Sequence, residues 1–136
     1  MNSTEPRGDS PLVLLVEDDR DTREMYAMCL RASGYRVEQA VTARDALGKA
    51  AAVSPDVVVT DLSLPGMDGL ALASQLHQHP QLGAIPVIAV TGYSMANDAG
   101  LHDIAAVLVK PCLPDDLVKA VARALSMVPP AGSSES

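Results

Sequence analysis

Short, uninterrupted runs of aliphatic residues recur along this chain, separated by longer stretches in which apolar residues have helical spacing. Four of the runs are too short for helices and have no polar face, which is typical of parallel strands buried on both sides. A fifth run, YRVEQA, alternates apolar and polar residues, so we predict a strand nearer the edge of a sheet. The predicted strands cover residues 12–16, 35–40, 57–59, 87–90 and 107–109.

Amphipathic spacing predicts helices over residues 20–32, 42–53, 68–78, 95–104 and 114–127. Thr42 and Asp68 are residues of the type that caps a helix N-terminus, and Gly34 is suited to end the first helix. The methionines are expected to fill the core rather than to form a binding groove. In the first helix the spacing places one set of side chains on the same side, namely Thr22, Met25, Met28, Cys29 and Ala32.

Strand and helix therefore alternate five times between two polar ends of the chain. This alternation predicts an α/β fold, a doubly wound five-stranded parallel sheet flanked by five helices and joined by right-handed crossovers. Residues 11–127 are expected to form one domain, with disordered tails over 1–10 and 128–136. In open parallel sheets the site lies beyond the carboxyl ends of the strands, so functional residues are expected at that edge.

Composition and charge narrow the class of protein. Apolar residues make up 48% of the chain, with no Trp or Phe, so an aliphatic core is expected. The net charge of −7 and the lack of a Lys or Arg cluster argue against nucleic acid binding within this chain. The sequence has no apolar run long enough for a bilayer and no signal peptide pattern, so we expect a cytoplasmic protein without membrane contact.

Charged and hydroxyl side chains follow the predicted strands at the points where they end. These are Glu17 and Asp18 after the first strand, Asp61 after the third, Thr91 after the fourth and Lys110 after the fifth. Each acidic residue alone is equally compatible with a helix cap. Packed together, however, carboxylates repel one another and need a cation, and Mg²⁺ suits such a site because it takes one or two carboxylates and keeps several waters. A carboxylate could then attack phosphorus while an ammonium and a hydroxyl stabilise the developing charge.

Four segments of the chain resemble the characteristic stretches of bacterial two-component response-regulator receiver domains, in the same order. They are LLVEDD, VVVTDLSLPGMDG, AVTG and VLVKP, and the resemblance covers roughly residues 11–127. It implies a flavodoxin-like (CheY-like) three-layer sandwich. It also implies a phosphoacceptor protein of a phosphorelay. Such a protein is not an enzyme and has at most self-phosphorylation and self-dephosphorylation activity.

The resemblance assigns roles around a bound Mg²⁺. Asp61 matches the phosphoacceptor of the family, and Asp18 matches the direct metal ligand. Glu17 matches the acidic residue that contacts the metal through water, and the backbone carbonyl of Ser63 matches a further ligand. The side chain of Ser63 also falls at a position that modulates the lifetime of the phosphoryl group.

Further roles follow from the same resemblance. Thr91 matches the switch hydroxyl, and Lys110 matches the ammonium that pairs first with the aspartate and then with the phosphate. Pro111 matches a proline that often follows a cis bond, although most X-Pro bonds are trans. Tyr93 is expected either to shield the phosphoryl group from water or to be an exposed loop residue. Val107 stands where the family commonly has Tyr or Phe, so a ring-flip relay cannot operate.

The expected function is therefore acceptance of a phosphoryl group onto Asp61 from a phosphohistidine on a histidine kinase or a histidine phosphotransfer protein. The downstream protein target is unknown. Val107 and a short predicted helix over 95–104 keep an alternative open, in which the chain is a phosphorylation-independent (pseudo-receiver) interaction module. A Mg²⁺-dependent phosphohydrolase of the haloacid-dehalogenase type is disfavoured, because such enzymes carry a second Asp where this chain has Ser63.

Overall fold

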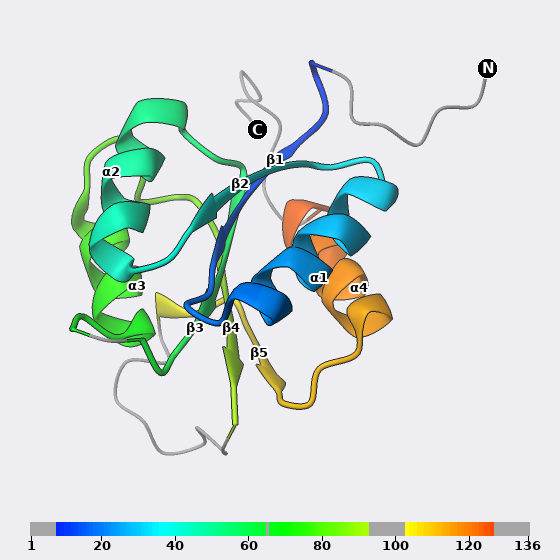
Figure 1. Ribbon diagram of the computed structural model, residues 1–136. Helices are drawn as coiled ribbons and strands as arrows, with labels where there is room; N and C mark the ends of the chain where they lie inside the picture. Colours follow the sequence, from blue (N-terminus) through cyan, green and yellow to red (C-terminus); the bar gives the residue numbers. More distant parts are fainter. Residues whose placement is uncertain (1–7, 65, 93–102, 127–136) are drawn as a thin grey trace.

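A computed structural model describes residues 8–64, 66–92 and 103–126 of the chain, and these form alternating strands and helices (Figure 1). The strands are β1 (Leu12–Val16), β2 (Arg36–Ala40), β3 (Val57–Asp61), β4 (Val87–Thr91) and β5 (Ala106–Val109). The helices are α1 (Arg20–Ala32), α2 (Ala43–Val53), α3 (Gly69–Gln78) and α4 (Pro114–Ser126).

All five strands lie parallel in one sheet, in the order β2-β1-β3-β4-β5. Helices α1 and α4 cover one face and α2 and α3 cover the other, which makes three layers (Figure 1). This confirms the predicted doubly wound α/β sheet, with the alternating strand β2 at an edge. Four helices lie among the described residues, and the expected helix over 95–104 falls almost entirely outside them. None of the helices that the structure describes is long and apolar enough to cross a bilayer.

The strands β1, β3 and β4 are buried on both faces because each side packs against a helical layer. The prediction of two-sided burial is wrong for residues 107–109, because β5 lies at the edge of the sheet and leaves Val107 and Val109 37% and 56% exposed. Leu15 and Val59 contact the layer of α1 and α4, whereas Leu14 and Val58 contact the layer of α2 and α3. Both clusters consist almost entirely of aliphatic side chains, as the composition predicted. The solid aliphatic runs of the sequence are thus explained by the two-sided burial of the central strands.

The side of α1 that the sequence spacing singled out is not its buried side. The helix buries Tyr26, Ala27 and Leu30, while Met25 and Met28 are 41% and 68% exposed. Residues three and four apart share a helix face, so α1 carries two neighbouring apolar stripes that spacing alone cannot rank. The contact with α4 and the sheet selects the stripe that contains Tyr26 and Leu30. The expectation that methionines fill the core therefore fails for both methionines of α1.

Local capping explains where the helices begin. Asp19, Thr42 and Asp68 each accept a hydrogen bond from the backbone N–H three residues later, at 2.9, 3.0 and 2.9 Å. Gly34 follows α1 with φ of +97°, a conformation that other residues adopt at a cost. The caps of α1 and α2 come within three residues of the strand before them, so these helices start at the carboxyl edge of the sheet.

Candidate functional site

The carboxyl edge of the sheet gathers polar side chains from four strands. Glu17 follows β1, Asp61 ends β3, Thr91 ends β4 and Lys110 follows β5. The register pairs Asp61 with Val90, directly before Thr91, so these two strand ends lie side by side. Residues distant in the sequence are thus brought to one place by the parallel order of the strands.

Asp61 lies at the centre of this group and is only 5% exposed. Its Oδ2 accepts a hydrogen bond from Lys110 Nζ at 2.6 Å, and its Oδ1 accepts one from the backbone N–H of Ser63 at 2.9 Å. Lys110 Nζ also lies 3.6 Å from Glu17 Oε1. One ammonium therefore compensates two buried carboxylates, since Glu17 is 2% exposed.

Glu17, Asp18 and Asp61 form a candidate cation site. One carboxylate oxygen from each residue lies within 4.8 Å of the others, and Asp18 is exposed whereas Glu17 and Asp61 are buried. Ligand oxygens of an octahedral Mg²⁺ site lie about 3 to 4 Å apart, so small side-chain adjustments suffice to bring these oxygens onto one ion. Three hard oxygen donors at this spacing fit Mg²⁺.

Backbone and side-chain contacts hold Glu17 in this group. Its Oε2 accepts a hydrogen bond from the N–H of Asp19 at 3.0 Å, and its carbonyl accepts one from Arg23 Nη1 at 2.9 Å. Burial raises the pKa of Glu17, and the charge of Asp61 adds to the increase, while the N–H of Asp19 and the charge of Lys110 oppose it. The carboxylates thus repel one another at close range, which is the condition that a bound cation relieves.

Lys110 remains an ammonium in this environment. Its partial burial alone would lower its pKa, but the hydrogen bond to Asp61 and the charges of Glu17 and Asp61 outweigh burial and raise the pKa. The backbone N–H of Lys110 donates to the carbonyl of Thr91 at 2.6 Å, and the side chain of Thr91 is fully buried. The hydroxyl and the ammonium are therefore carried by backbone segments that are bonded to each other.

The other predicted site residues lie as follows. Ser63 is exposed two residues after Asp61, the bond between Lys110 and Pro111 is cis, and Val107 is 37% exposed on the edge strand β5. Tyr93 lies outside the described residues. The structure brings together Glu17, Asp18, Asp61 and Lys110, while the roles inferred for all of these residues stay predictions.

Two residues that support the site were not predicted. Gly69 begins α3, and a Cβ there would lie 2.6 Å from the carbonyl oxygen of Asp61. Arg23 holds the carbonyl of Glu17 and donates from Nε to Gln39 Oε1 at 3.2 Å. The Asp-Gly pair that opens α3 was a usable signal for Gly69, whereas nothing in the sequence distinguishes Arg23 from any other polar helix residue.

The fold and this pocket define the class of protein, an α/β domain with an acidic site at the carboxyl edge of its parallel sheet. The family model of the response regulator receiver domain matches residues 13–122. The chain therefore belongs to the response regulator receiver domain family.

Three relatives illustrate this membership. The chain is 38% identical over 122 residues to the C4-dicarboxylate transport transcriptional regulatory protein DctD of Rhizobium meliloti, covering 85% of this chain and 25% of that protein. The chemotaxis response regulator CheY4 of Vibrio cholerae superimposes with a TM-score of 0.80 and 30% identity, covering 85% of this chain and 99% of CheY4. TrrA of Thermotoga maritima, solved in complex with Mg²⁺-BeF, gives a TM-score of 0.78 and 27% identity, covering 85% of this chain and 99% of TrrA. The chain thus matches all of a small regulator but only a quarter of DctD.

Proposed function

We propose that this chain is a cytoplasmic, phosphorylatable switch in which Asp61 accepts a phosphoryl group from a phosphohistidine. The donor would be a histidine kinase or a histidine phosphotransfer protein. One observation carries the proposal: a nearly buried Asp61 carboxylate has an ammonium at 2.6 Å and two further carboxylates within 4.8 Å. The solved complex of the relative TrrA with Mg²⁺-BeF supports it.

In the proposed step an oxygen of the Asp61 carboxylate attacks phosphorus. The bond between phosphorus and the imidazole nitrogen of the donor breaks, and the nitrogen keeps the electron pair. Lys110 then moves its ammonium contact from the carboxylate to the phosphoryl oxygens, and the hydroxyl of Thr91 donates to one of them. Mg²⁺ held by Asp18, Asp61, the carbonyl of Ser63 and, through water, Glu17 would neutralise charge on the phosphoryl oxygens.

The switch itself is the response of the β4 and β5 ends to the new charge. Because the N–H of Lys110 is bonded to the carbonyl of Thr91, movement of either residue toward a phosphoryl group shifts the other. Val107 contributes no aromatic ring to this response, so the signal would pass through backbone movement of the β4 and β5 ends. The downstream protein target is not identified by these features.

The proposal is tested by incubating the protein with Mg²⁺ and a small acyl phosphate and measuring the intact mass. We expect the gain of one phosphoryl group, lost on chelation of the metal and absent in Asp61→Asn. A protein that binds partners without phosphorylation would show no gain in mass, and a phosphohydrolase would turn over the acyl phosphate steadily without retaining it. Either result would refute the proposal.

Magnesium is expected to stabilise the folded protein, because it neutralises carboxylates that repel one another in the native state. At a free concentration one hundred times the dissociation constant, the free energy of unfolding should rise by about 2.7 kcal/mol. Asp18→Asn should unfold at a slightly higher urea concentration without metal, since one repulsive charge is gone, and should lose most of the response to Mg²⁺. Urea denaturation with and without Mg²⁺ measures both effects, and an equal response of the two proteins would contradict the assignment of Asp18.

A further inference from the structure

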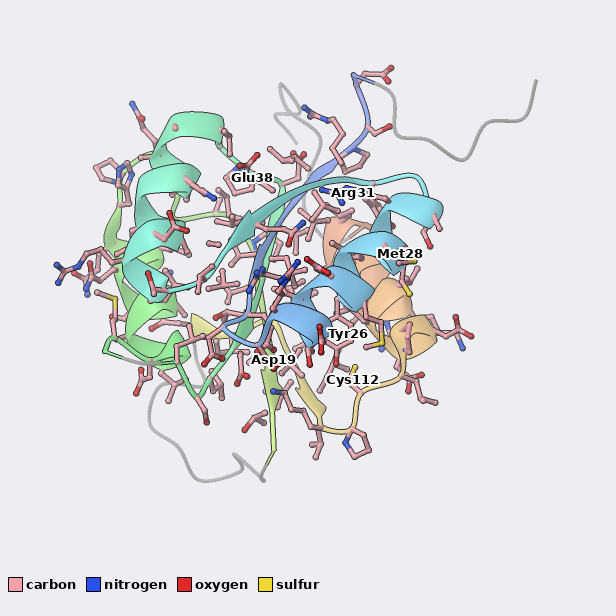
Figure 2. The ribbon with its side chains drawn as sticks, viewed as in Figure 1. Asp19, Tyr26, Met28, Arg31, Glu38 and Cys112 are labelled. Atoms are coloured by element: carbon pink, nitrogen blue, oxygen red, sulfur yellow. The ribbon has the colours of Figure 1, made fainter. Side chains whose placement is uncertain are left out.

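Tyr26 is a buried tyrosine on the inner face of α1, and it is only 4% exposed. Its hydroxyl donates a hydrogen bond to the carbonyl of Cys112 at 3.3 Å, across 86 positions of the sequence. Figure 2 shows the two residues, with Tyr26 on α1 and Cys112 on the segment that leads into α4. A hydroxyl buried at this depth needs such a partner, so the contact links α1 to the segment after β5.

The segment that receives this hydrogen bond carries Lys110. The N–H of Lys110 is bonded to Thr91 at its start, and α4 begins only at Pro114. Pro111 has no N–H to donate. Among the described residues, the hydroxyl of Tyr26 makes the one tertiary hydrogen bond to residues 111–113. This hydrogen bond therefore ties the backbone directly after Lys110 to α1, beside the packing of the Cys112 side chain in the core.

The tyrosine also lies beside the lysine side chain. Both residues line an open surface pocket of about 450 Å³ together with Met25, Pro111 and Cys112. Burial raises the pKa of Tyr26, so the phenol keeps its proton at neutral pH and remains a hydrogen-bond donor. The ammonium of Lys110 is carried by a flexible four-carbon stem, and its position on Asp61 depends on how its backbone and neighbours are held.

We propose that Tyr26 is a positioning residue for Lys110. By holding the carbonyl of Cys112, Tyr26 fixes the backbone segment that carries the lysine. This inference rests on the proposed function, since it concerns the lysine that would bind the phosphoryl group. It predicts a selective defect. Loss of the hydroxyl should weaken binding at the Lys110 side of the site, while Glu17, Asp18 and Asp61 stay in place because β1 and β3 carry them.

The test compares Tyr26→Phe with Tyr35→Phe, which removes a hydroxyl from a half-buried tyrosine that packs against the same core. Calorimetry measures the affinity for Mg²⁺ alone, and then for beryllofluoride, a mimic of the phosphoryl group, in excess Mg²⁺. We expect Tyr26→Phe to bind beryllofluoride roughly threefold to tenfold more weakly, as for loss of one buried hydrogen bond. Its affinity for Mg²⁺ alone should not fall, and Tyr35→Phe should match the wild type in both titrations.

A double-mutant cycle with Lys110→Ala shows whether the tyrosine acts through the lysine. Once Lys110 is absent, adding Tyr26→Phe should cause no further loss of beryllofluoride affinity. An additive loss in the double variant, or an equal loss of Mg²⁺ affinity in Tyr26→Phe, would overturn the inference and leave a purely structural role. Circular dichroism of each variant establishes that the proteins compared are folded.

The outcomes separate the inference from the proposed function. If the wild-type protein fails to bind beryllofluoride in the presence of Mg²⁺, the proposed function fails and the inference fails with it. If the wild type binds and Tyr26→Phe binds equally well, the inference alone fails. A spectroscopic signature supports the distinction: with tyrosine labelled with ¹³C in the ring, the Tyr26 signal should shift on addition of beryllofluoride and the Tyr35 signal should not.

Discussion

Lys110→Ala is expected to slow phosphorylation of Asp61 by about 100- to 1,000-fold, the range for loss of one preorganised charge stabiliser. The ammonium lies 2.6 Å from the carboxylate that would be modified, so it is in place before the phosphoryl group arrives. Its raised pKa keeps it charged at neutral pH, with the hydrogen bond and charge of Asp61 and the charge of Glu17 outweighing the effect of burial. The rate of mass gain with a small acyl phosphate measures the effect.

The same substitution should also destabilise the metal-free protein. Glu17 and Asp61 are 2% and 5% exposed and would lose their shared counter-ion. Breaking a fully buried pair costs about 3–5 kcal/mol, and because the Lys110 side chain is 34% exposed we expect a smaller loss. Screening by solvent reduces the expected loss to about 1–3 kcal/mol, and Mg²⁺ should restore most of it.

Lys119→Ala is the matched control, because it removes the same charge from an exposed position on α4. It should leave the rate of phosphorylation unchanged. A Lys110→Ala protein that accepts phosphate at the wild-type rate would show that the ammonium is a structural counter-ion only. In that case the destabilisation without metal would remain as its one effect.

Gly69→Ala is expected to lower the free energy of unfolding by about 1–3 kcal/mol, the usual cost of forcing an atom into packed structure. The added Cβ would lie 2.6 Å from the carbonyl oxygen of Asp61 and 2.8 Å from Leu62 Cδ2. Relief of this clash must move α3 or the end of β3, and the latter carries the carboxylate. The substitution should therefore slow phosphorylation as well, measured alongside urea denaturation.

Gly48→Ala, at a second glycine within a helix, is expected to change the free energy of unfolding in the opposite direction. Gly48 is exposed within α2, and an added Cβ there meets nothing within 4 Å. The exchange should stabilise the protein by about 0.5–1 kcal/mol, since alanine is the better helix former. If Gly69→Ala were as harmless as Gly48→Ala, close packing at the start of α3 would not constrain the site.

The sequence by itself determined the order of the elements and the edge at which the site forms. Solid aliphatic runs such as residues 12–16 and 87–90 indicate parallel strands, and in the centre of the sheet these strands are buried on both faces. Thr42 and Asp68 specify helix starts through hydrogen bonds that span three residues. Since parallel strands share a carboxyl edge, the placement of Asp61 and Lys110 on one edge follows from their positions at strand ends.

Only the tertiary structure decided which groups touch. Helix α1 has two apolar stripes, one with Met25 and Met28 and the other with Tyr26 and Leu30. Packing against α4 buries the stripe of Tyr26 and Leu30. The approach of Gly69 to the carbonyl of Asp61 and the bond from Tyr26 to Cys112 likewise join segments whose local sequence does not specify them. Periodicity and capping act over a few residues, whereas these contacts depend on how whole helices settle against the sheet.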